Sequence, residues 1–305
     1  MKIDIHIMTC HRCDYVPTAP GFNPNVWKTP EERLEISKIS IDSFRRFISS
    51  VNQNSISSVS IINDGSTYEP ALKWLSSITD IDVVNYDNMG SGPAMSKYIE
   101  SLDDDVDLVA HFEDDQIMFN PLNKDWADIA YRLISSEKEY GGFIRAVCFR
   151  SGHGCISSSH HKYAHSFTKK YNLAYNTVPY LGNSQFVIDL DSIKQLLPIE
   201  GNRGNSETYI NEKKNKLGII HAEIQDHIFM FHSHVLEGGI PQIPNTDSLR
   251  NWVKGEVFGI KNLHQHLLGG NMIDCIIVTD EINGTYKKET LRLEEYYYGN
   301  KKTKS

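Results

Sequence analysis

Hydrophobic residues follow two different periods along the first 120 residues of the chain. Four stretches have the pattern of strands, with IDIHIM alternating strictly and the others forming short apolar runs: residues 3–8, 59–62, 81–86 and 106–112. Three stretches have apolar residues at helical spacing: residues 31–48, 69–78 and 94–102. Strands and helices therefore alternate, which predicts parallel strands joined by right-handed crossovers.

The pattern is less regular in the second half. Strands are expected within residues 143–149, 180–188, 219–222 and 229–234. Helices are expected at residues 126–136, 190–197 and 207–217, and polar loops at 151–165 and 201–205. After Gly238 and Gly239 a proline-dotted segment leads to a C-terminal lobe, where residues 274–279 are strand-like and 286–297 are expected to be helical.

Polar clusters follow the ends of the first four predicted strands. They are TCHR (9–12), NDGS (63–66), NMGSG (88–92) and EDD (113–115). In parallel α/β sheets the ligand lies outside the carboxyl ends of the strands, so these clusters are expected on one edge. Three acids at the end of a buried strand are costly to desolvate unless a positive charge faces them. A divalent cation, which takes oxygen ligands and also holds substrate phosphates, would supply that charge.

Composition narrows the class of protein. The 305 residues are 40% hydrophobic and 23% charged, as in an ordinary globular protein. A formal net charge of −8 gives no general attraction to nucleic acid or to anionic membranes. The apolar run at the N-terminus is too short for a signal peptide, and no run reaches membrane length, so no membrane span is expected.

Cysteine usage points to a reducing compartment, and we predict a cytoplasmic protein. The five cysteines are odd in number and irregularly spaced, which does not indicate a disulfide framework. Cys10 and Cys13 form a single CxxC, which could be a redox pair or half of a zinc site, but a second pair is missing.

The order of motifs resembles one known family. A first strand followed by TCHR, then IINDGST, NMGSGPA and HFEDDQIMF, is similar to the GT-A glycosyltransferases, especially their family-two-like group. The resemblance implies an α/β fold with a Rossmann-like, mostly parallel central sheet flanked by helices. It covers residues 1–235, with a nucleotide-sugar half at 1–120 and an acceptor half at 121–235. Residues 236–305 would form a small C-terminal lobe packed on this domain.

The resemblance also implies roles on the donor side. Thr9 and Arg12 lie where the family cups the nucleobase, and Asp64 matches the acid that binds the base or ribose. The residues expected close to the nucleotide are Asn88, Gly90 and Gly92. Glu113 or Asp114 would bind ribose or metal.

Metal and catalytic roles are implied in the same way. Asp115 is the candidate ligand for Mn²⁺ or Mg²⁺ and the donor diphosphate, with His232 or His234 as a further metal ligand. Such a metal would neutralise the charge that develops on the leaving diphosphate. Glu207 matches the base of inverting members, which takes the proton of the acceptor hydroxyl. If the enzyme retains configuration, Glu207 would only orient substrate, and the sequence does not choose between the two.

Each of these motifs also has a purely structural interpretation. The EDD cluster could be a solvated turn, Asp64 could make an Asx turn, and Gly90 and Gly92 could simply permit positive φ. Glu207 could be a first-turn acid favoured by the helix dipole. His232 and His234 could be a hydrogen-bonded pair. The His-rich loop at 151–165 could be an acceptor-side lid or solvated chain.

The expected function is transfer of a sugar from a nucleoside diphosphate sugar, with UDP-sugar first, to a hydroxyl of a surface-glycan precursor. A rival function is phage-type glycosylation of hydroxymethylated pyrimidines in DNA. It would require a basic footprint on the acceptor side, for which the candidates are Lys169, Lys170, Lys213, Lys214, Lys216 and Lys261.

Two further functions fit the strand-end acids. The first is a metal-dependent nucleotidyltransferase, which needs a basic residue over the α-phosphate, and the second is a non-catalytic binding module. The missing QxxRW-type element and hydrophobic tail argue against a processive membrane synthase. The oligomeric state stays open.

Overall fold

The structure is a computed structural model. It describes residues 1–12, 29–119, 124–149, 168–170, 173–178, 185–200, 205–224, 229–232, 272–280 and 285–292.

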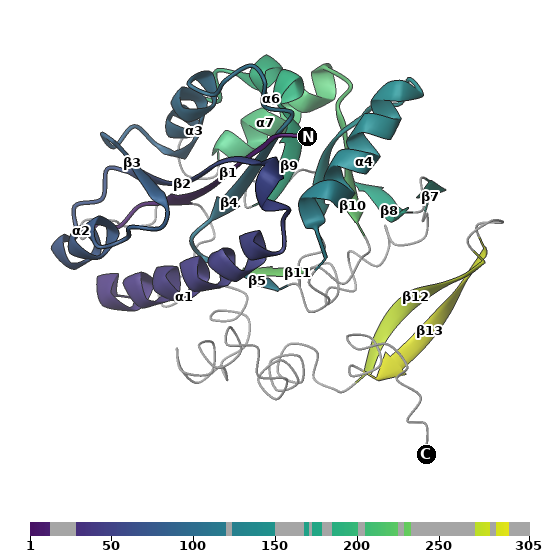
Figure 1. Ribbon diagram of the computed structural model, residues 1–305, viewed down its shortest axis with the longest axis horizontal. Coiled ribbons are helices and arrows are strands. Elements are labelled where there is room, and N and C mark those ends of the chain that lie inside the picture. Colours follow the sequence, from purple (N-terminus) through teal and green to yellow (C-terminus); the bar gives the residue numbers. More distant parts are fainter. Residues whose placement is uncertain are drawn as a thin grey trace.

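The described strands form one large sheet and two small ones (Figure 1). The large sheet has the order β3-β2-β1-β4-β9-β6-β10-β8-β7. Its strands are β1 (Ile3–Thr9), β2 (Ile56–Asp64), β3 (Asp82–Tyr86), β4 (Leu108–Glu113), β6 (Ile144–Phe149), β7 (Thr168–Lys170), β8 (Leu173–Val178), β9 (Gln185–Asp189) and β10 (Ile220–Ile224). In the described sheet, β8 and β9 run antiparallel to the other seven strands. Each antiparallel pair includes β8 or β9, and all the other pairs are parallel. The predicted mostly parallel α/β sheet is confirmed.

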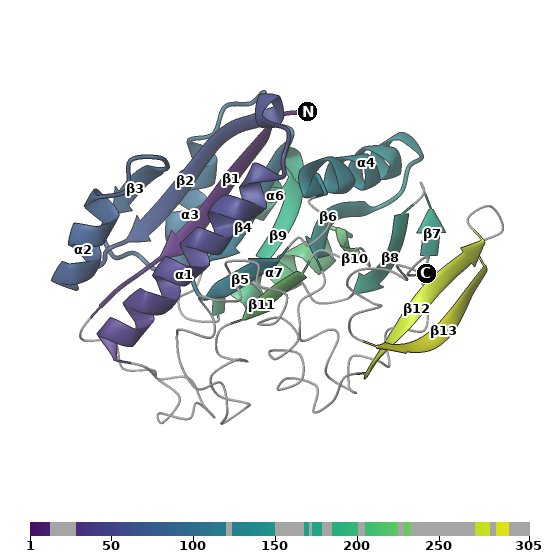
Figure 2. The same ribbon diagram turned by 60° about the horizontal axis from the view of Figure 1, so that its bottom comes forward.

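Two small sheets complete the described part. β5 (Gln116–Phe119) pairs antiparallel with β11 (Phe229–His232), so the chain just after the EDD cluster is joined to a segment more than 100 residues later. β12 (Met272–Asp280) pairs antiparallel with β13 (Thr285–Arg292). This hairpin lies beyond the β7 end of the large sheet (Figures 1 and 2).

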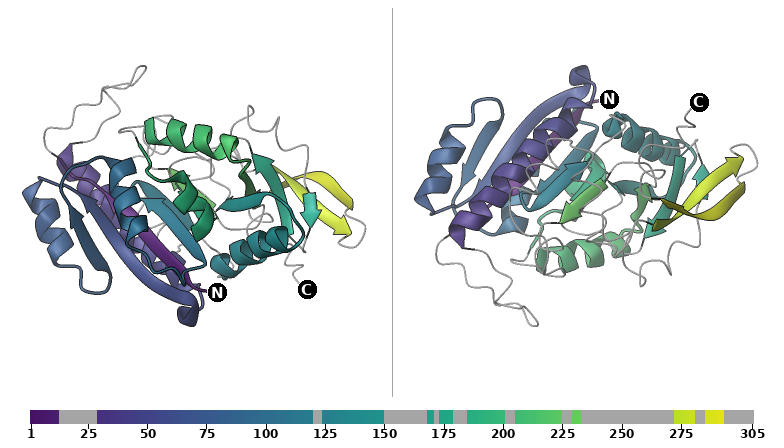
Figure 3. Two further views of the ribbon diagram at one scale, coloured as in Figure 1. Left: turned by 90° about the horizontal axis from the view of Figure 1, so that it is seen from above. Right: turned by 90° about the horizontal axis from the view of Figure 1, so that it is seen from below.

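Helices cover both faces of the large sheet, as Figures 2 and 3 show. The helices are α1 (Pro30–Ser49), α2 (Glu69–Ser76), α3 (Ser91–Glu100), α4 (Trp126–Glu139), α6 (Leu190–Leu196) and α7 (Asn205–Lys216), with a 3-10 turn at Gln53–Ser55. α1, α2 and α4 pack on one face with the first hydrophobic cluster. α3, α6 and α7 pack on the other face with the second cluster.

The central strand β1 shows how both faces are filled. Ile3, Ile5 and Ile7 face the α1 and α4 layer, where Phe47 stacks on Trp126 with ring centroids 4.9 Å apart. Complete burial of side chains of this size is worth about 1.5–3 kcal/mol each. The aromatic cluster therefore fixes α1 and α4 against the sheet.

The polar positions of β1 are buried as well, contrary to the usual meaning of an alternating strand. Asp4 Oδ1 lies 3.2 Å from His6 Nδ1, and His6 Nε2 lies 3.0 Å from His111 Nδ1 on β4. The Tyr98 hydroxyl of α3 donates to Asp4 Oδ2 at 2.9 Å, so the network ties α3 to the sheet. These groups are completely or almost completely buried because they satisfy one another.

Most predicted elements are confirmed within a few residues, with some differences. β5, β7 and β8 fall in regions where no strand was predicted. α3 begins at Ser91, earlier than expected, since Pro93 is tolerated in a first helical turn, where its missing N–H has no partner to lose.

The predicted helix at 286–297 is wrong, because Thr285–Arg292 pairs with β12 as a strand. Its Thr and Tyr residues favour a strand, and the pairing with β12 outweighs the local helical pattern. The His-rich loop at 151–165 and the loop at 201–204 lie outside the described residues. The division into a domain at 1–235 and an extension at 236–305 stays a prediction.

His221 on β10 provides a test of the packing on the α7 side. Burial and the nearby positive charge of Lys214, whose Nζ lies 3.5 Å from His221 Nδ1, lower the pKa of His221 to about 3. An ordinary histidine has a pKa of about 6.5, so the contribution of this neutral ring is present above about pH 6.5 and is lost as the pH falls toward 3. We expect His221→Gln to flatten the fall in unfolding free energy between about pH 6.5 and about pH 4, by up to about 1.4 kcal/mol per pH unit. Urea unfolding across this range measures the effect, and equal slopes in parent and variant would contradict it.

Candidate functional site

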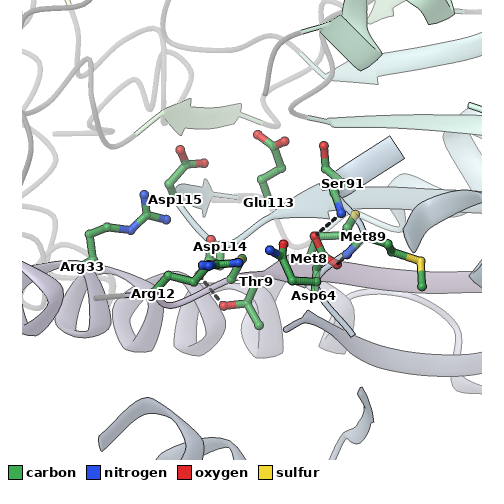
Figure 4. A pocket seen from close by; sticks show the side chains of 13 residues that line it. Met8, Thr9, Arg12, Arg33, Asp64, Met89, Ser91, Glu113, Asp114 and Asp115 are labelled. Atoms are coloured by element: carbon green, nitrogen blue, oxygen red, sulfur yellow. Dashed lines mark hydrogen bonds between the residues drawn. The ribbon is translucent and has the colours of Figure 1, made fainter. Parts of the chain in front are cut away.

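The ends of β1, β2, β3 and β4 meet at one edge of the sheet and surround a cavity of about 420 Å³ (Figure 4). Its lining residues come from all four predicted polar clusters and from α1: Met8, Thr9, Cys10, Arg12, Arg33, Asp64, Asn88, Met89, Gly90, Ser91, Glu113, Asp114 and Asp115. The parallel register explains this convergence, since parallel neighbours bring their carboxyl ends to the same edge.

Asp64 joins the end of β2 to the loop after β3. Its two carboxylate oxygens accept hydrogen bonds from the backbone N–H groups of Met89 and Gly90, each at 3.0 Å. Burial raises the pKa of Asp64, although these two bonds and the charge of Arg12 act in the opposite direction. Asp64 therefore shapes the 88–90 loop as well as lining the cavity.

The turn in NDGS is made by another residue. Asn63 Oδ1 accepts from the backbone N–H of Ser66 at 3.2 Å and from its hydroxyl at 2.5 Å. The Asx-turn interpretation therefore belongs to Asn63. Gly65 has φ of 66°, and a Cβ there would lie 2.4 Å from the backbone nitrogen of Asn88. Glycine is required because the two loops touch at this point.

Asp114 has a different role from its two neighbours. Its Oδ2 atom accepts from Thr9 Oγ1 at 2.6 Å and from Ser37 Oγ of α1. In Figure 4, Asp114 lies next to Thr9, whereas Glu113 and Asp115 both point away from it in a common direction. Asp114 thus ties β1, β4 and α1 together, and Glu113 and Asp115 are the acids of the cluster that point away from Asp114 along the cavity wall.

Arg12 and Arg33 bring positive charge to this acidic edge. Both line the cavity, Arg12 from the segment after β1 and Arg33 from the first turns of α1. The cavity also has four acids, so the fully ionised lining carries four negative and two positive charges, a net of −2. Arg33 was missed in the sequence because it lies outside the four strand-end clusters.

Two further titratable groups beside these charges are neutral at neutral pH. Burial lowers the pKa of His11, whose ring is 2% exposed and whose Nε2 lies 3.4 Å from Asp114 Oδ2 without hydrogen-bonding geometry. Burial also raises the pKa of the Cys10 thiol to about 11. Cys10 is therefore a protonated thiol at neutral pH, which disfavours the redox interpretation of CxxC; Cys13 lies outside the described residues.

Two predicted site residues approach the cavity from the second half of the chain. His232 ends β11 and pairs with Gln116, the residue that follows Asp115. Glu207 lies in the first turn of α7, next to Ser206, which is fully buried with its Oγ 3.5 Å from the Oγ of the cavity residue Ser91. Both positions in the fold are thus next to the acidic edge.

The predicted site residues can be sorted by whether they line the cavity. Eight predicted residues line the cavity: Thr9, Arg12, Asp64, Asn88, Gly90, Glu113, Asp114 and Asp115. Gly92 is not among the lining residues and is buried in the first turn of α3. His234 lies outside the described residues. Gly90 has φ of 95°, as the structural interpretation expected for this position.

The side chains of the cavity supply only some of the ligand atoms that a divalent cation needs. Glu113 and Asp115 offer carboxylate oxygens on one side of the cavity, which suits Mg²⁺ or Mn²⁺. Within the described side chains, however, no group of three or more His, Cys, Asp or Glu residues could hold a metal. Further ligands would have to come from a bound phosphate or from residues such as His232.

Comparison with known proteins gives similarity of structure alone. No protein-family model and no curated protein matches the sequence. The chain is similar to S. aureus TarS, with 11% identity, a TM-score of 0.48, and 87% of this chain and 72% of that chain covered. It is also similar to GalNAc-T7 with UDP, GalNAc and Mn²⁺, at 9% identity and a TM-score of 0.47, with 76% of this chain and 43% of that chain covered.

A third similar structure is glucosyl-3-phosphoglycerate synthase from Mycobacterium tuberculosis with Mg²⁺ and UDP. The identity is 12% and the TM-score is 0.41, with 95% of this chain and 87% of that chain covered. Two of these three structures hold UDP and a divalent metal.

Asp64→Ala tests the connection between the two loops. The substitution leaves the N–H groups of Met89 and Gly90 without their acceptor, which we expect to lower the unfolding free energy by about 2 kcal/mol. Hydrogen exchange at these two amides should accelerate as the loop loosens. Asp82→Ala, at the exposed start of β3, is the matched control and should change neither quantity. Unchanged exchange in the Asp64 variant would show that the loop does not depend on this carboxylate.

Proposed function

We propose that this chain is a glycosyltransferase that moves a sugar from a nucleoside diphosphate sugar to a hydroxyl group. A UDP-sugar is the proposed donor. The observation that carries this proposal is the cavity itself, in which three acids of the β2 and β4 ends, Asp64, Glu113 and Asp115, share one space with Arg12 and Arg33. A nucleotide needs a recess for base and ribose and charges that match a diphosphate, and this edge offers both.

The donor half of the site follows from the strand ends. The Thr9 and Arg12 segment and the loop at 88–91, fixed by Asp64, form the parts of the wall assigned to base and ribose. The diphosphate would then lie toward Glu113 and Asp115. This arrangement agrees with the general rule that ligands of parallel sheets bind beyond the carboxyl ends of the strands.

Glu113 and Asp115 would hold a divalent metal together with the diphosphate, and His232 is the proposed further ligand. When bound, the metal neutralises the charge on the leaving diphosphate without a proton transfer. The net charge of −2 over the ionised cavity lining supports binding of one divalent cation.

The acceptor half would be formed around the first turn of α7. We propose Glu207 as the base that takes the proton of the acceptor hydroxyl as this oxygen attacks the anomeric carbon. The contact between Ser206 and Ser91 supports this placement, because it brings the turn that contains Glu207 beside the cavity wall.

A surface-glycan precursor is the proposed acceptor, rather than DNA. Two of the lysines considered for a DNA footprint have internal roles. Lys214 is 1% exposed, and Lys213 Nζ donates to the carbonyl oxygens of Leu196 and Leu197 at the end of α6, at 3.0 and 2.6 Å. Neither is therefore placed to contact phosphates of a duplex. We propose a cytoplasmic location from the odd number and irregular spacing of the cysteines. Separately, no helix of the described chain has the length and apolar character of a membrane span.

A metal-dependent nucleotidyltransferase is a second candidate, and the arginines favour it. The NMGSG loop contains no basic residue to face an α-phosphate, but Arg12 and Arg33 reach the cavity from other elements. The two functions differ in the leaving group. A glycosyltransferase releases a nucleoside diphosphate from a nucleotide sugar, whereas a nucleotidyltransferase releases pyrophosphate from a nucleoside triphosphate.

Asp115→Ala tests the metal and donor site. UDP with Mn²⁺ should raise the melting temperature of the parent, because a ligand that binds the folded state stabilises it by mass action. The Asp115 variant should lose most of this increase, while Asp103→Ala, an exposed acid ahead of β4, should retain it. A thermal-shift series with and without Mn²⁺ measures both. An Asp115 variant that binds like the parent would remove this residue from the metal site.

Glu207→Gln tests the catalytic base. We expect kcat for sugar transfer to fall by about 10²–10⁴-fold, since a positioned base contributes this much, while UDP binding stays near that of the parent. Glu212→Gln, exposed on the same helix, is the control. The measurement is release of UDP from UDP-sugars with and without an acceptor. Full turnover in the Glu207 variant would assign it an orienting or structural role.

A further inference from the structure

A row of serines fastens α1 along the acidic strand and the segment that follows it. Ser37 donates to the Asp114 carboxylate, Ser40 donates to the backbone oxygen of Gln116, and Ser43 Oγ accepts from the backbone N–H of Met118 at 3.1 Å. All three serines are at most 2% exposed. The spacing of three residues puts them on one face of the helix. We call Ser37, Ser40 and Ser43 the serine row.

Arg33 continues this row by one helical turn. It precedes Ser37 by four residues and so lies on the same face of α1. The serine row therefore determines where Arg33 stands, because it fixes both the rotation of α1 and its position along β4 and β5. At that position Arg33 lines the cavity together with Glu113 and Asp115 (Figure 4).

The charges of Arg12 and Arg33 both act on Cys10, and each also acts on a further group at this edge. The charge of Arg12 acts to lower the pKa of Asp64, and the charge of Arg33 acts to lower the pKa of His11, the neighbour of Asp114. Arg12 and Arg33 are the cationic residues among those that line the cavity. Of the two, Arg33 is the one on α1, the helix that Ser37 joins to Asp114 of the EDD cluster.

We propose that Arg33, positioned by the serine row, binds the phosphate groups of the ligand in this cavity. The inference rests on the proposed function, in which this ligand is a nucleoside diphosphate, and it adds a specific residue from outside the strand-end motifs. A phosphate brought to four carboxylates meets strong repulsion, which a permanently charged side chain at the same edge offsets. The planar guanidinium can make two parallel hydrogen bonds to one phosphate, which the ammonium of a lysine cannot reproduce.

The simpler explanation is that Arg33 only balances the charge of the acids. In that case its loss would affect stability or the shape of the cavity, and ligands with and without phosphate would be affected equally. If Arg33 binds phosphate, its loss would weaken phosphate-bearing ligands and leave a nucleoside unchanged. The two cases therefore differ in ligand preference.

The experiment measures binding of UDP, inorganic pyrophosphate and uridine by calorimetry, with Mn²⁺ present throughout. Four proteins are compared: the parent, Arg33→Gln, Arg33→Lys and Arg46→Gln. Arg46 is the matched control, an exposed arginine on the same helix. We expect Arg33→Gln to weaken UDP and pyrophosphate by about 10- to 100-fold, as for loss of hydrogen bonds to a charged group, with uridine unchanged. Arg33→Lys should recover only part of this loss, and Arg46→Gln should match the parent.

Each contrary outcome has a definite meaning. Equal UDP affinity in the parent and Arg33→Gln overturns the role of Arg33 and leaves the proposed function standing. An equal loss of uridine overturns it as well, because Arg33 would then only shape the cavity. Pyrophosphate binding that depends on Arg33, in a protein that does not bind UDP, supports the anion site and overturns the proposed function. A parent that binds neither overturns both.

Ser37→Ala tests the serine row while leaving Arg33 in place. We expect weaker UDP binding in the same direction as Arg33→Gln but by a smaller factor, with uridine unchanged. Ser49→Ala, at the exposed end of α1, is the control. Thermal unfolding of each variant confirms that it is folded. UDP affinity equal to the parent in Ser37→Ala would show that Arg33 reaches its position without the row.

Discussion

The site depends on one buried carboxylate, that of Asp114, which is surrounded by hydroxyl groups. Thr9 from β1 and Ser37 from α1 both donate to its Oδ2 atom, so a single group joins the first strand, the first helix and the acid-tipped strand β4. A carboxylate this deeply buried is tolerated because it is hydrogen-bonded. Its demand for donors explains why Ser37 lies on the inner face of α1.

Because Asp114 and Asp64 are committed to the framework, the remaining acids can serve a ligand in a defined direction. Asp64 holds the 88–90 loop, and Asp114 holds α1 and β1. Glu113 and Asp115 then extend from a rigid edge (Figure 4). Acids adjacent in sequence thus have different roles because β4 ends at Glu113, and the turn that follows directs Asp114 toward Thr9 while Asp115 lines the cavity. Composition alone could not have separated these roles.

The parts of the molecule that the sequence predicted are those specified by local pattern. The order of strands and helices up to the end of β4 at Glu113, and the convergence of TCHR, NDGS, NMGSG and EDD, follow from periodicity and from the geometry of parallel sheets. Arg33 could not be found in this way, since its place in the cavity depends on how α1 is docked by Ser37. The buried Asp4 and His6 were similarly hidden, because alternation alone suggests a solvated face. Pairing with β12 decided the structure of 285–292, which local residues left ambiguous.

The charges of the cavity explain both the proposed metal ion and the proposed phosphate-binding role of Arg33. Four carboxylates and two guanidinium groups leave a net charge of −2 when all are ionised. A diphosphate would increase this negative charge, so its binding requires a mobile cation, a fixed cation placed next to the phosphates, or both. A mobile metal can be shared with the leaving group, and a fixed guanidinium gives direction to the phosphates. In the proposed site, the acidic edge that would hold the metal and the arginine of α1 are therefore complementary parts of one anion-binding arrangement.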